Sequence, residues 1–143
     1  MLFLHPTTVS LDSAPLPAVS AIAVSRKARS VITDFTDNGP HPTFADVPER
    51  LTTITITRHP TEPDDAAAHL SLGDQLDLAF TARRTPDAPH AMRCSASIVI
   101  TGVESALTES KALVQTITGV AISSDAESDP LTIEPVSTLS QGA

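Results

Sequence analysis

The feature of this sequence that most constrains its fold is a pair of β-branched, apolar runs in the C-terminal half. Ser97–Val103 and Ala112–Ile122 flank a short polar connection at Glu104–Lys111. In the first run, alternation with a period of two residues places Ile98 and Ile100 on one face, which is the pattern of a β-strand. The two runs therefore predict a long β-hairpin with both faces partly covered.

The same alternation predicts strands in the rest of the chain. Leu51–Arg58 shows it most clearly, because isoleucines occupy one face and threonines the other. The other predicted strands are Thr7–Leu11, Ala18–Ser25, Ala28–Phe35, Gln75–Arg83 and Leu131–Val136. We expect the first two of these to pair as a hairpin across a turn at Asp12–Pro15. The last should be an edge strand, because Pro135 cannot donate to a ladder.

One short helix is expected at Asp64–Leu70, where acidic residues precede three alanines and Gly73 follows. Helical periodicity is otherwise nearly absent, and turn signals are frequent. For a chain of 143 residues these features predict one domain, residues 1–143, of the all-β class. The expected architecture is a β-sandwich or barrel of about seven or eight antiparallel strands with one short α-helix on its flank.

Residues Thr36–Arg50 are predicted to form a long loop. The segment contains three prolines and few periodic apolar residues. A loop of about 15 residues without regular structure is uncommon and often has a functional or assembly role. We assign a candidate assembly site to this segment, with residues Asp37, Asn38, Gly39, Pro40, Phe44 and Val47. The last residues, Ser137–Ala143, are expected to form a loose tail.

The composition argues against several classes of function. A net charge of −8 repels phosphate backbones and anionic membranes. Four Phe, with no Trp or Tyr, leave few aromatic platforms on which bases could stack. The single cysteine cannot form an intrachain disulfide, and no apolar run approaches the length of about 18 residues that a membrane span needs. We therefore expect neither a dedicated nucleic-acid binder nor a membrane protein.

Two candidate reactive positions have simpler interpretations. His69 and Asp65 are spaced i, i+4 on the predicted helix and could hold a metal, but a surface pair near a helix C-terminus is the commoner arrangement. Cys94 begins a predicted strand and could be a nucleophile beside a histidine, but a small buried apolar residue is the commoner role. No G-x-S-x-G, P-loop or paired-carboxylate pattern occurs in the sequence, so we expect no enzyme activity and no cofactor.

Two kinds of charged cluster stand out. The basic clusters Arg26–Arg29 and Arg83–Arg84 lack the glycine-rich loop of a phosphate site. We expect them to be solvated strand ends or to pair with an acidic neighbouring subunit. Asp125, Glu127 and Asp129 resemble part of a calcium loop in composition, but the central Gly and the closing Glu of such a loop are missing.

Three stretches share a recognisable layout: VSLDSAPLPAVSAIAVSRKA, LTTITITRHP with DDAAAHLSLGDQLDLAFTA, and IVITGVESALTESKALVQTITGVAIS. The first stretch corresponds to a hairpin with a small turn. The second corresponds to a strand, a short helical insert and then the pattern LxxGDxLxLxF, and the third corresponds to a closing hairpin. In this layout, which covers residues 7–133, the chain resembles the tail tube proteins of tailed bacteriophages and related phage-derived particles. It departs from that family in having only 5 Gly and as many as 12 Pro.

The resemblance implies a β-sandwich or barrel with a flanking helix, copies of which close into a hexameric ring. Stacked rings would form a tube in the virion tail, assembled in the host cytoplasm, through which double-stranded DNA passes without specific binding. The implied partners are other copies of the chain and other tail proteins, with the arm at Thr36–Arg50 reaching a neighbouring subunit or ring. The family has no active-site residues to transfer. Thr101, Thr116 and Thr118 are the expected candidates for a face that lines the lumen or meets a neighbour.

Two alternatives stay open at the level of sequence. The chain could be another virion component, such as a tube initiator, a tail terminator or a coat protein. It could also be a monomeric binding β-sandwich. The oligomeric state distinguishes a monomeric binding β-sandwich from a tube subunit. The number of copies per particle distinguishes another virion component from a tube subunit.

Overall fold

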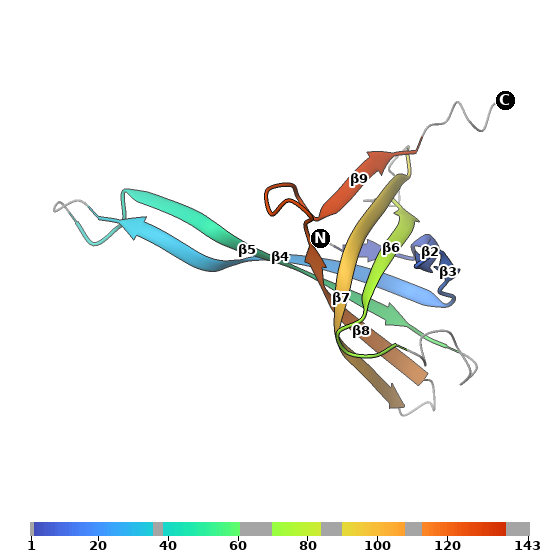
Figure 1. Cartoon of the computed structure of the whole chain (residues 1–143). Helices are drawn as coiled ribbons and strands as arrows, with labels where there is room; N and C mark the ends of the chain where they lie inside the picture. The colour runs from blue at the N-terminus through green and yellow to red at the C-terminus, as the bar shows by residue number, and fades with distance from the viewer. Residues whose placement is uncertain (1, 36–38, 61–69, 84–89, 108–112, 137–143) are drawn as a thin grey trace.

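The computed structural model of the chain describes residues 2–35, 39–60, 70–83, 90–107 and 113–136. Within these residues the chain forms nine β-strands and no helix (Figure 1). The strands are β1 (Leu2–Leu4), β2 (Thr7–Leu11), β3 (Ala14–Pro15), β4 (Val19–Asp34), β5 (Phe44–Arg58), β6 (Gln75–Ala82), β7 (Met92–Leu107), β8 (Leu113–Ile122) and β9 (Leu131–Pro135). The predicted all-β class is confirmed for the described part of the chain.

All the strands belong to one antiparallel sheet. Its order is β1-β4-β5-β8-β7-β6-β2-β3, and β9 pairs with the first residues of β7. The predicted C-terminal hairpin is confirmed as β7–β8, and the predicted strand at the end of the chain is confirmed as β9. The sheet is not closed, because β1 and β3 form its two ends. The architecture is therefore an open sheet rather than a closed barrel.

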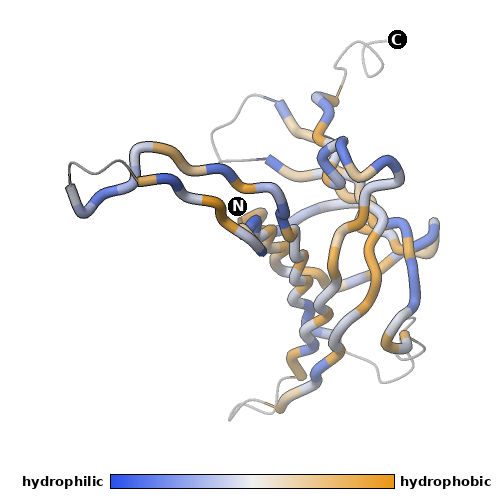
Figure 2. Tube along the Cα trace, turned by 60° about the vertical axis from the view of Figure 1, so that its left-hand side comes forward, coloured by the Kyte–Doolittle hydropathy of each residue, from blue (hydrophilic) through white to orange (hydrophobic). Residues whose placement is uncertain are grey.

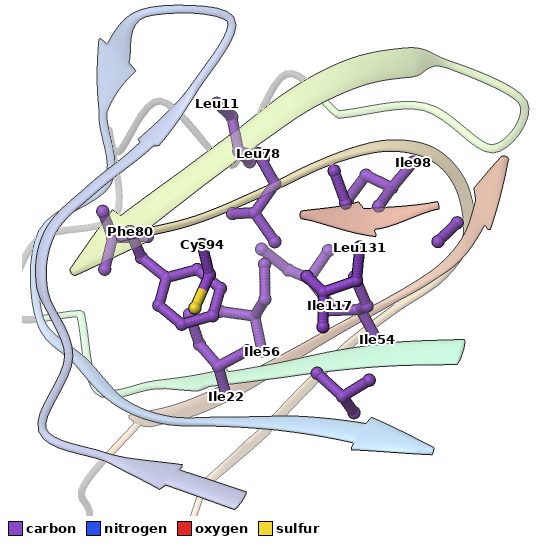
Figure 3. Close-up of a cluster of buried hydrophobic side chains, with 14 of the residues drawn as sticks. Leu11, Ile22, Ile54, Ile56, Leu78, Phe80, Cys94, Ile98, Ile117 and Leu131 are labelled. Carbon is purple, nitrogen blue, oxygen red and sulfur yellow. The ribbon is translucent and has the colours of Figure 1, made fainter. Parts of the chain in front are cut away.

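Burial alternates along the central strands, and this alternation builds the core. In β5 and β8 the side chains of Ile54, Ile56 and Ile117 are fully buried, while the threonines between them face outward. Figure 3 shows the buried cluster, in which aliphatic side chains from most of the strands point into the space that the sheet encloses, with Phe80 and Cys94 toward one end. Burying each large aliphatic side chain contributes about 1.5–3 kcal/mol, so this single face supplies most of the driving force for folding.

Two short links bring the opposite ends of the sheet together. Only His5 and Pro6 lie between β1, at one end of the sheet, and β2, which is next to the other end. Three peptide units span at most about 11 Å, so the sheet must curl until its ends lie side by side. Leu16–Ala18 form the second link, between β3 and β4. Across the curled sheet, Phe3 and Phe80 meet edge to face with ring centroids 5.2 Å apart.

Arg58, the last residue of β5, holds the second link from inside the molecule. Its side chain is fully buried. Its Nε and Nη2 donate to the carbonyl oxygen of Pro17 at 3.2 and 3.1 Å, and its Nη1 donates to Oε1 of Gln115 at 2.8 Å. Burial lowers the pKa of the Arg58 guanidinium, but an arginine in a protein stays protonated. One charged group thus joins the link, β5 and β8.

β4 and β5 extend far beyond the rest of the sheet. Among the described strands, β1 reaches only the start of β4, and β8 covers only the end of β5. β4 and β5 nevertheless stay paired with each other as far as Asp34 and Phe44. Residues 26–34 and 44–52 therefore form a two-stranded ribbon, here called the arm, which projects from the body of the molecule (Figure 1).

The predicted loop at Thr36–Arg50 is wrong over most of its described length. Phe44–Arg50 is part of β5 and pairs with β4, so the described part of the connection is Phe35 with Gly39–Thr43. The prolines suggested a loop because proline cannot donate to a ladder. Pro48 is accommodated where the register between β4 and β5 shifts and β5 holds an extra residue, which is a position that tolerates proline.

Two other strand predictions are also wrong. The segments Ala18–Ser25 and Ala28–Phe35 are not separate strands but one, because the ladder with β5 continues through the basic residues between them. Thr7–Leu11 does not pair with Ala18–Ser25 but with β3 and β6. The predicted turn instead joins β2 to β3, and its Asp12 and Ser13 have φ of 50° and 67°, as a two-residue hairpin turn of type I′ requires.

Two predicted segments fall outside the described residues. One is the short helix at Asp64–Leu70, of which only Leu70 is described, in no regular element. The other is the C-terminal tail at Ser137–Ala143.

Replacing Arg58 by alanine is expected to destabilise the fold by about 2–4 kcal/mol. The substitution leaves the carbonyl of Pro17 and the side-chain amide of Gln115 buried without the donor that each has now. Equilibrium unfolding in urea measures the loss. Arg58→Lys is the matched control, because an ammonium keeps the charge but cannot serve both partners from one planar fork, so its loss should be smaller. An unchanged unfolding midpoint for Arg58→Ala would contradict the anchoring role.

Candidate assembly site

The arm lacks the support that the central strands have. Within the described residues, each of its two strands has the other as its sole strand neighbour, so both outer backbone edges are unpaired. A two-stranded ribbon buries little surface and is at best marginally stable alone in water. Unpaired edges of this kind are also templates for pairing with another chain.

Large apolar side chains are exposed toward the end of the arm. Val31, Ile32, Phe35 and Phe44 each leave between 53% and 56% of their surface accessible. Ile32 and Phe44 belong to ladder positions two residues apart, so they share one face, whereas Val31 lies on the opposite face. Figure 2 shows apolar segments on both strands of the arm. Covering these side chains would contribute on the order of 1 kcal/mol each, so both faces favour a partner.

The base of the arm is basic. Four of the nine Lys and Arg residues in the chain lie there: Arg26, Lys27, Arg29 and Arg50. The Nη2 of Arg26 is 2.9 Å from Oδ2 of Asp129, and the Nη1 of Arg29 is 3.4 Å from Oε2 of Glu49. Exposed ion pairs of this kind contribute about 0–1 kcal/mol. Both contacts lie within the chain, and pairing of this cluster with a neighbouring subunit stays a prediction.

Asp125 organises the loop between β8 and β9, residues 123–130. Its carboxylate accepts hydrogen bonds from the hydroxyl of Ser123 at 2.8 Å and from the amide of Glu127 at 3.0 Å. It also accepts from the amide and the hydroxyl of Ser128 at 2.8 and 2.7 Å. These donors, those of Ser128 above all, hold the pKa of Asp125 far below its ordinary value of 3.8. The carboxylate of Asp125, one of the three residues that resemble part of a calcium loop, therefore accepts hydrogen bonds from within its own loop.

The same loop borders an open groove lined by both polar and apolar residues, and it contacts the arm. The groove has a volume of about 570 Å³ and lies between the loop and the outer face of β6 and β7. Asp129 accepts a hydrogen bond from the amide of Leu131 at 3.0 Å through Oδ1, while its Oδ2 meets Arg26. The loop therefore contacts the base of the arm at the point where the arm leaves the body.

The structure places the predicted assembly residues along and beside the arm. Phe44 is exposed at the start of β5, and Val47 is half-buried within the same strand. Gly39 and Pro40 are exposed between the two strands. The other two predicted residues, Asp37 and Asn38, lie outside the described residues.

Sequence reasoning missed the apolar residues on the β4 side of the arm, two of which lie in β4 and one, Phe35, directly after it. Val31, Ile32 and Phe35 belong to a run that resembles a core strand, and nothing local distinguishes the two cases. The one available signal was that this run comes directly before the segment with Asn38 and Gly39, which is typical of a hairpin turn.

The other candidate positions lie elsewhere. Cys94 is fully buried in the core, which confirms the role of a small apolar residue. Asp65 and His69, the possible metal pair, lie outside the described residues, as does Arg84. In the part of the chain that the structure describes, no group of three or more His, Cys, Asp or Glu residues is placed to hold a metal ion.

The three threonines singled out from the sequence come together on the outside of the β7–β8 hairpin. Thr116 and Thr118 face outward from β8 and are half-buried. Thr101 is exposed, and its hydroxyl donates to the carbonyl of Thr118 at 3.3 Å. A role for this surface in a lumen or a contact stays a prediction.

The arm combines unpaired backbone edges, apolar side chains on both faces and a basic base, and it is the most distinctive surface of the described residues. No protein-family model matches this chain, and no curated protein matches it. Over the residues that the structure describes, no helix has the length and apolar character needed to cross a bilayer.

The carboxyl group of Asp125 is expected to remain ionised at a pH where ordinary aspartates are protonated. Its pKa is lower in the folded than in the unfolded state, so its stabilising contribution is complete above the ordinary value of 3.8 and is lost as the pH falls toward the folded pKa. A carboxyl ¹³C NMR titration between about pH 5 and about pH 2 measures this. Ser128→Ala is the control, because it removes one of the donors and should raise the pKa of Asp125. A wild-type Asp125 that titrates near 3.8 would show that the loop is not organised as described.

Proposed function

We propose that this protein is a structural virion protein, a tail tube subunit whose copies assemble through the arm into stacked, hexameric rings that conduct the genome. The observation that carries the proposal is the arm itself. It is a projecting ribbon with apolar side chains on both faces, and within the described residues its edges are unpaired and the body does not cover it. The resemblance in strand layout to tail tube proteins supplies the identity of the assembly.

Docking of the arm on a second copy is compatible with a ring or a tube. The contact joins two different surfaces, and it is heterologous unless the two copies exchange arms about a two-fold axis. Heterologous contacts produce rings when the rotation closes and extended filaments when it does not. A tube of stacked rings combines both outcomes, and it also covers the strand edges that would otherwise favour uncontrolled pairing.

The charge distribution is compatible with a conduit for nucleic acid. Residues 26–50 hold four cationic and four anionic residues, so the net charge of −8 belongs to the rest of the chain. An acidic body repels a phosphate backbone, which lets double-stranded DNA pass without being bound. In this proposal the partners are other copies of the chain, other tail proteins and DNA in transit, and the protein acts in the virion tail after assembly in the host cytoplasm. The proposal assigns it no catalytic residue, cofactor or membrane contact.

Replacing Ile32 and Phe44 together by serine is expected to abolish assembly while leaving the fold intact. Both side chains are more than half exposed in the single chain, so their loss should change the unfolding midpoint little, but it removes apolar contact area in the assembly. Sedimentation velocity and negative-stain electron microscopy at high protein concentration measure the outcome.

The matched control is the double variant Leu72→Ser with Leu107→Ser. These two leucines are 69% and 73% exposed but lie away from the arm. Rings or tubes should persist in the control and disappear in the arm variant. Tube growth by the arm variant would refute the assembly role, and a wild-type protein that stays monomeric at all concentrations would refute the proposed function. A tube initiator or terminator would use the same arm, and the number of copies per particle separates those roles from a tube subunit.

A further inference from the structure

The outer face of the curled sheet has an unusual uncharged surface over four neighbouring strands. The ladders place its residues in rows, because directly paired residues point to the same side. One row is Leu4, Ala21, Thr57 and Thr116, a second is Leu2, Ala23, Thr55 and Thr118, and a third is Ser25, Thr53 and Val120. We call this surface the threonine face. It contains no charged side chain.

From this surface we infer that the threonine face is the docking site for the arm of a second copy of the chain. The inference rests on the proposed assembly and names the surface that receives the arm. Open antiparallel sheets that face water usually present polar and charged side chains on that side. Here Leu2 and Leu4 are 54% and 60% exposed beside alanines and threonines, so the face has the character of a contact surface.

The sizes of the two surfaces agree. With strands about 4.8 Å apart and about 6.7 Å between residues on one side, four strands and three rows cover roughly 19 Å by 20 Å. The distal half of the arm, residues 30–34 and 44–48, is two strands wide and five residues long, which gives a ribbon about 10 Å by 17 Å. One face of this distal half therefore fits on the threonine face.

Charge distinguishes this surface from the rest of the body. The distal half of the arm, residues 30–34 and 44–48, carries Asp34 and Asp46 and no cationic residue. The arm carries four cationic and three anionic residues, so the rest of the chain has a net charge of −9 and on average repels these two carboxylates. The threonine face does not repel them, and it offers Leu2 and Leu4 to the exposed side chains of the arm.

The occupant must come from another copy. The arm continues β4 and β5 past the start of β1 and the end of β8, so it extends along the strand direction beyond its own threonine face (Figure 1). If a free peptide or a different protein bound the threonine face, the exposed apolar side chains of the arm would still have no partner. A second copy accounts for both surfaces with one contact.

The sign of a charge placed on the threonine face provides the test. Thr118→Glu and Thr118→Lys put side chains of similar length at one position, and they differ in whether they repel or attract Asp34 and Asp46. At low salt, where charges act over tens of ångströms, we expect Thr118→Glu to weaken self-association at least tenfold more than Thr118→Lys. The apparent dissociation constant is measured by sedimentation equilibrium, with circular dichroism to verify that both variants are folded.

Each outcome of this test has a defined meaning. If the two variants weaken association equally, the threonine face pairs with itself in a second copy, and the inference is overturned. If neither variant changes the association of a wild-type protein that does assemble, the face lies outside the contact, and the inference is overturned while the proposed function stands. If the wild-type protein never assembles, both are overturned.

Disulfide trapping tests the contact without relying on charge. Thr55→Cys on the face and Asp46→Cys on the arm are made in separate preparations and mixed. Asp46 pairs with Ile32 and shares the arm face of Ile32 and Phe44, and the native Cys94 is fully buried and does not compete. The expected product under mild oxidation is a disulfide-linked heterodimer of the two variants. Thr132→Cys, at an exposed position of β9, replaces Thr55→Cys as the control and should give none. Equal yields from both mixtures would count against the inference.

Discussion

The fold depends on the shortness of the two links that join opposite ends of the sheet. Because only His5 and Pro6 separate β1 from β2, an open sheet of nine strands has to curl until its ends meet. Curling gives the sheet one enclosed face, where the isoleucines and the Phe3–Phe80 pair gather, and one outer face. Arg58 then makes the curled state specific, because its guanidinium finds both of its stated partners only when the second link and β8 are in place.

The arm is a consequence of the same geometry. β4 is 16 residues long and β5 is 15, whereas β1 supplies only three residues and the β5–β8 ladder only six. The two strands therefore continue past the end of the core, and their apolar side chains emerge with nothing from the described body to cover them. A ribbon of this kind is costly for a protein that stays alone, because it exposes both edges and both faces. Contact with a second copy would cover these edges and faces, and this gain in stability is the reason for the proposed assembly.

In the central strands, the inner face forms the core, and the outer face is the one available for association. Alternation sends Ile54 and Ile56 inward and the threonines of β5 outward, so one stretch of sequence serves both purposes. Threonine suits the outer face because its branched side chain stabilises a strand and its hydroxyl tolerates either water or a neighbour. In a monomer, a face without charges can stay in contact with water. In an assembly, the same face can be covered without burying an ion.

The amino-acid sequence by itself determined which residues form most of the strands and which side of each faces the core. Leu51–Arg58, Gln75–Ala82 and the β7–β8 hairpin follow from alternation with a period of two, which is a local property of the chain. Phe44, Val47, Gly39 and Pro40 were also assigned to an arm, although the arm was expected to be a loop. Only the tertiary structure decided that Phe44–Arg50 is a strand, because a segment with Pro48 becomes one only when β4 lies beside it. It also decided that Val31 and Ile32 are exposed, since alternation states which residues share a face but not where the core ends.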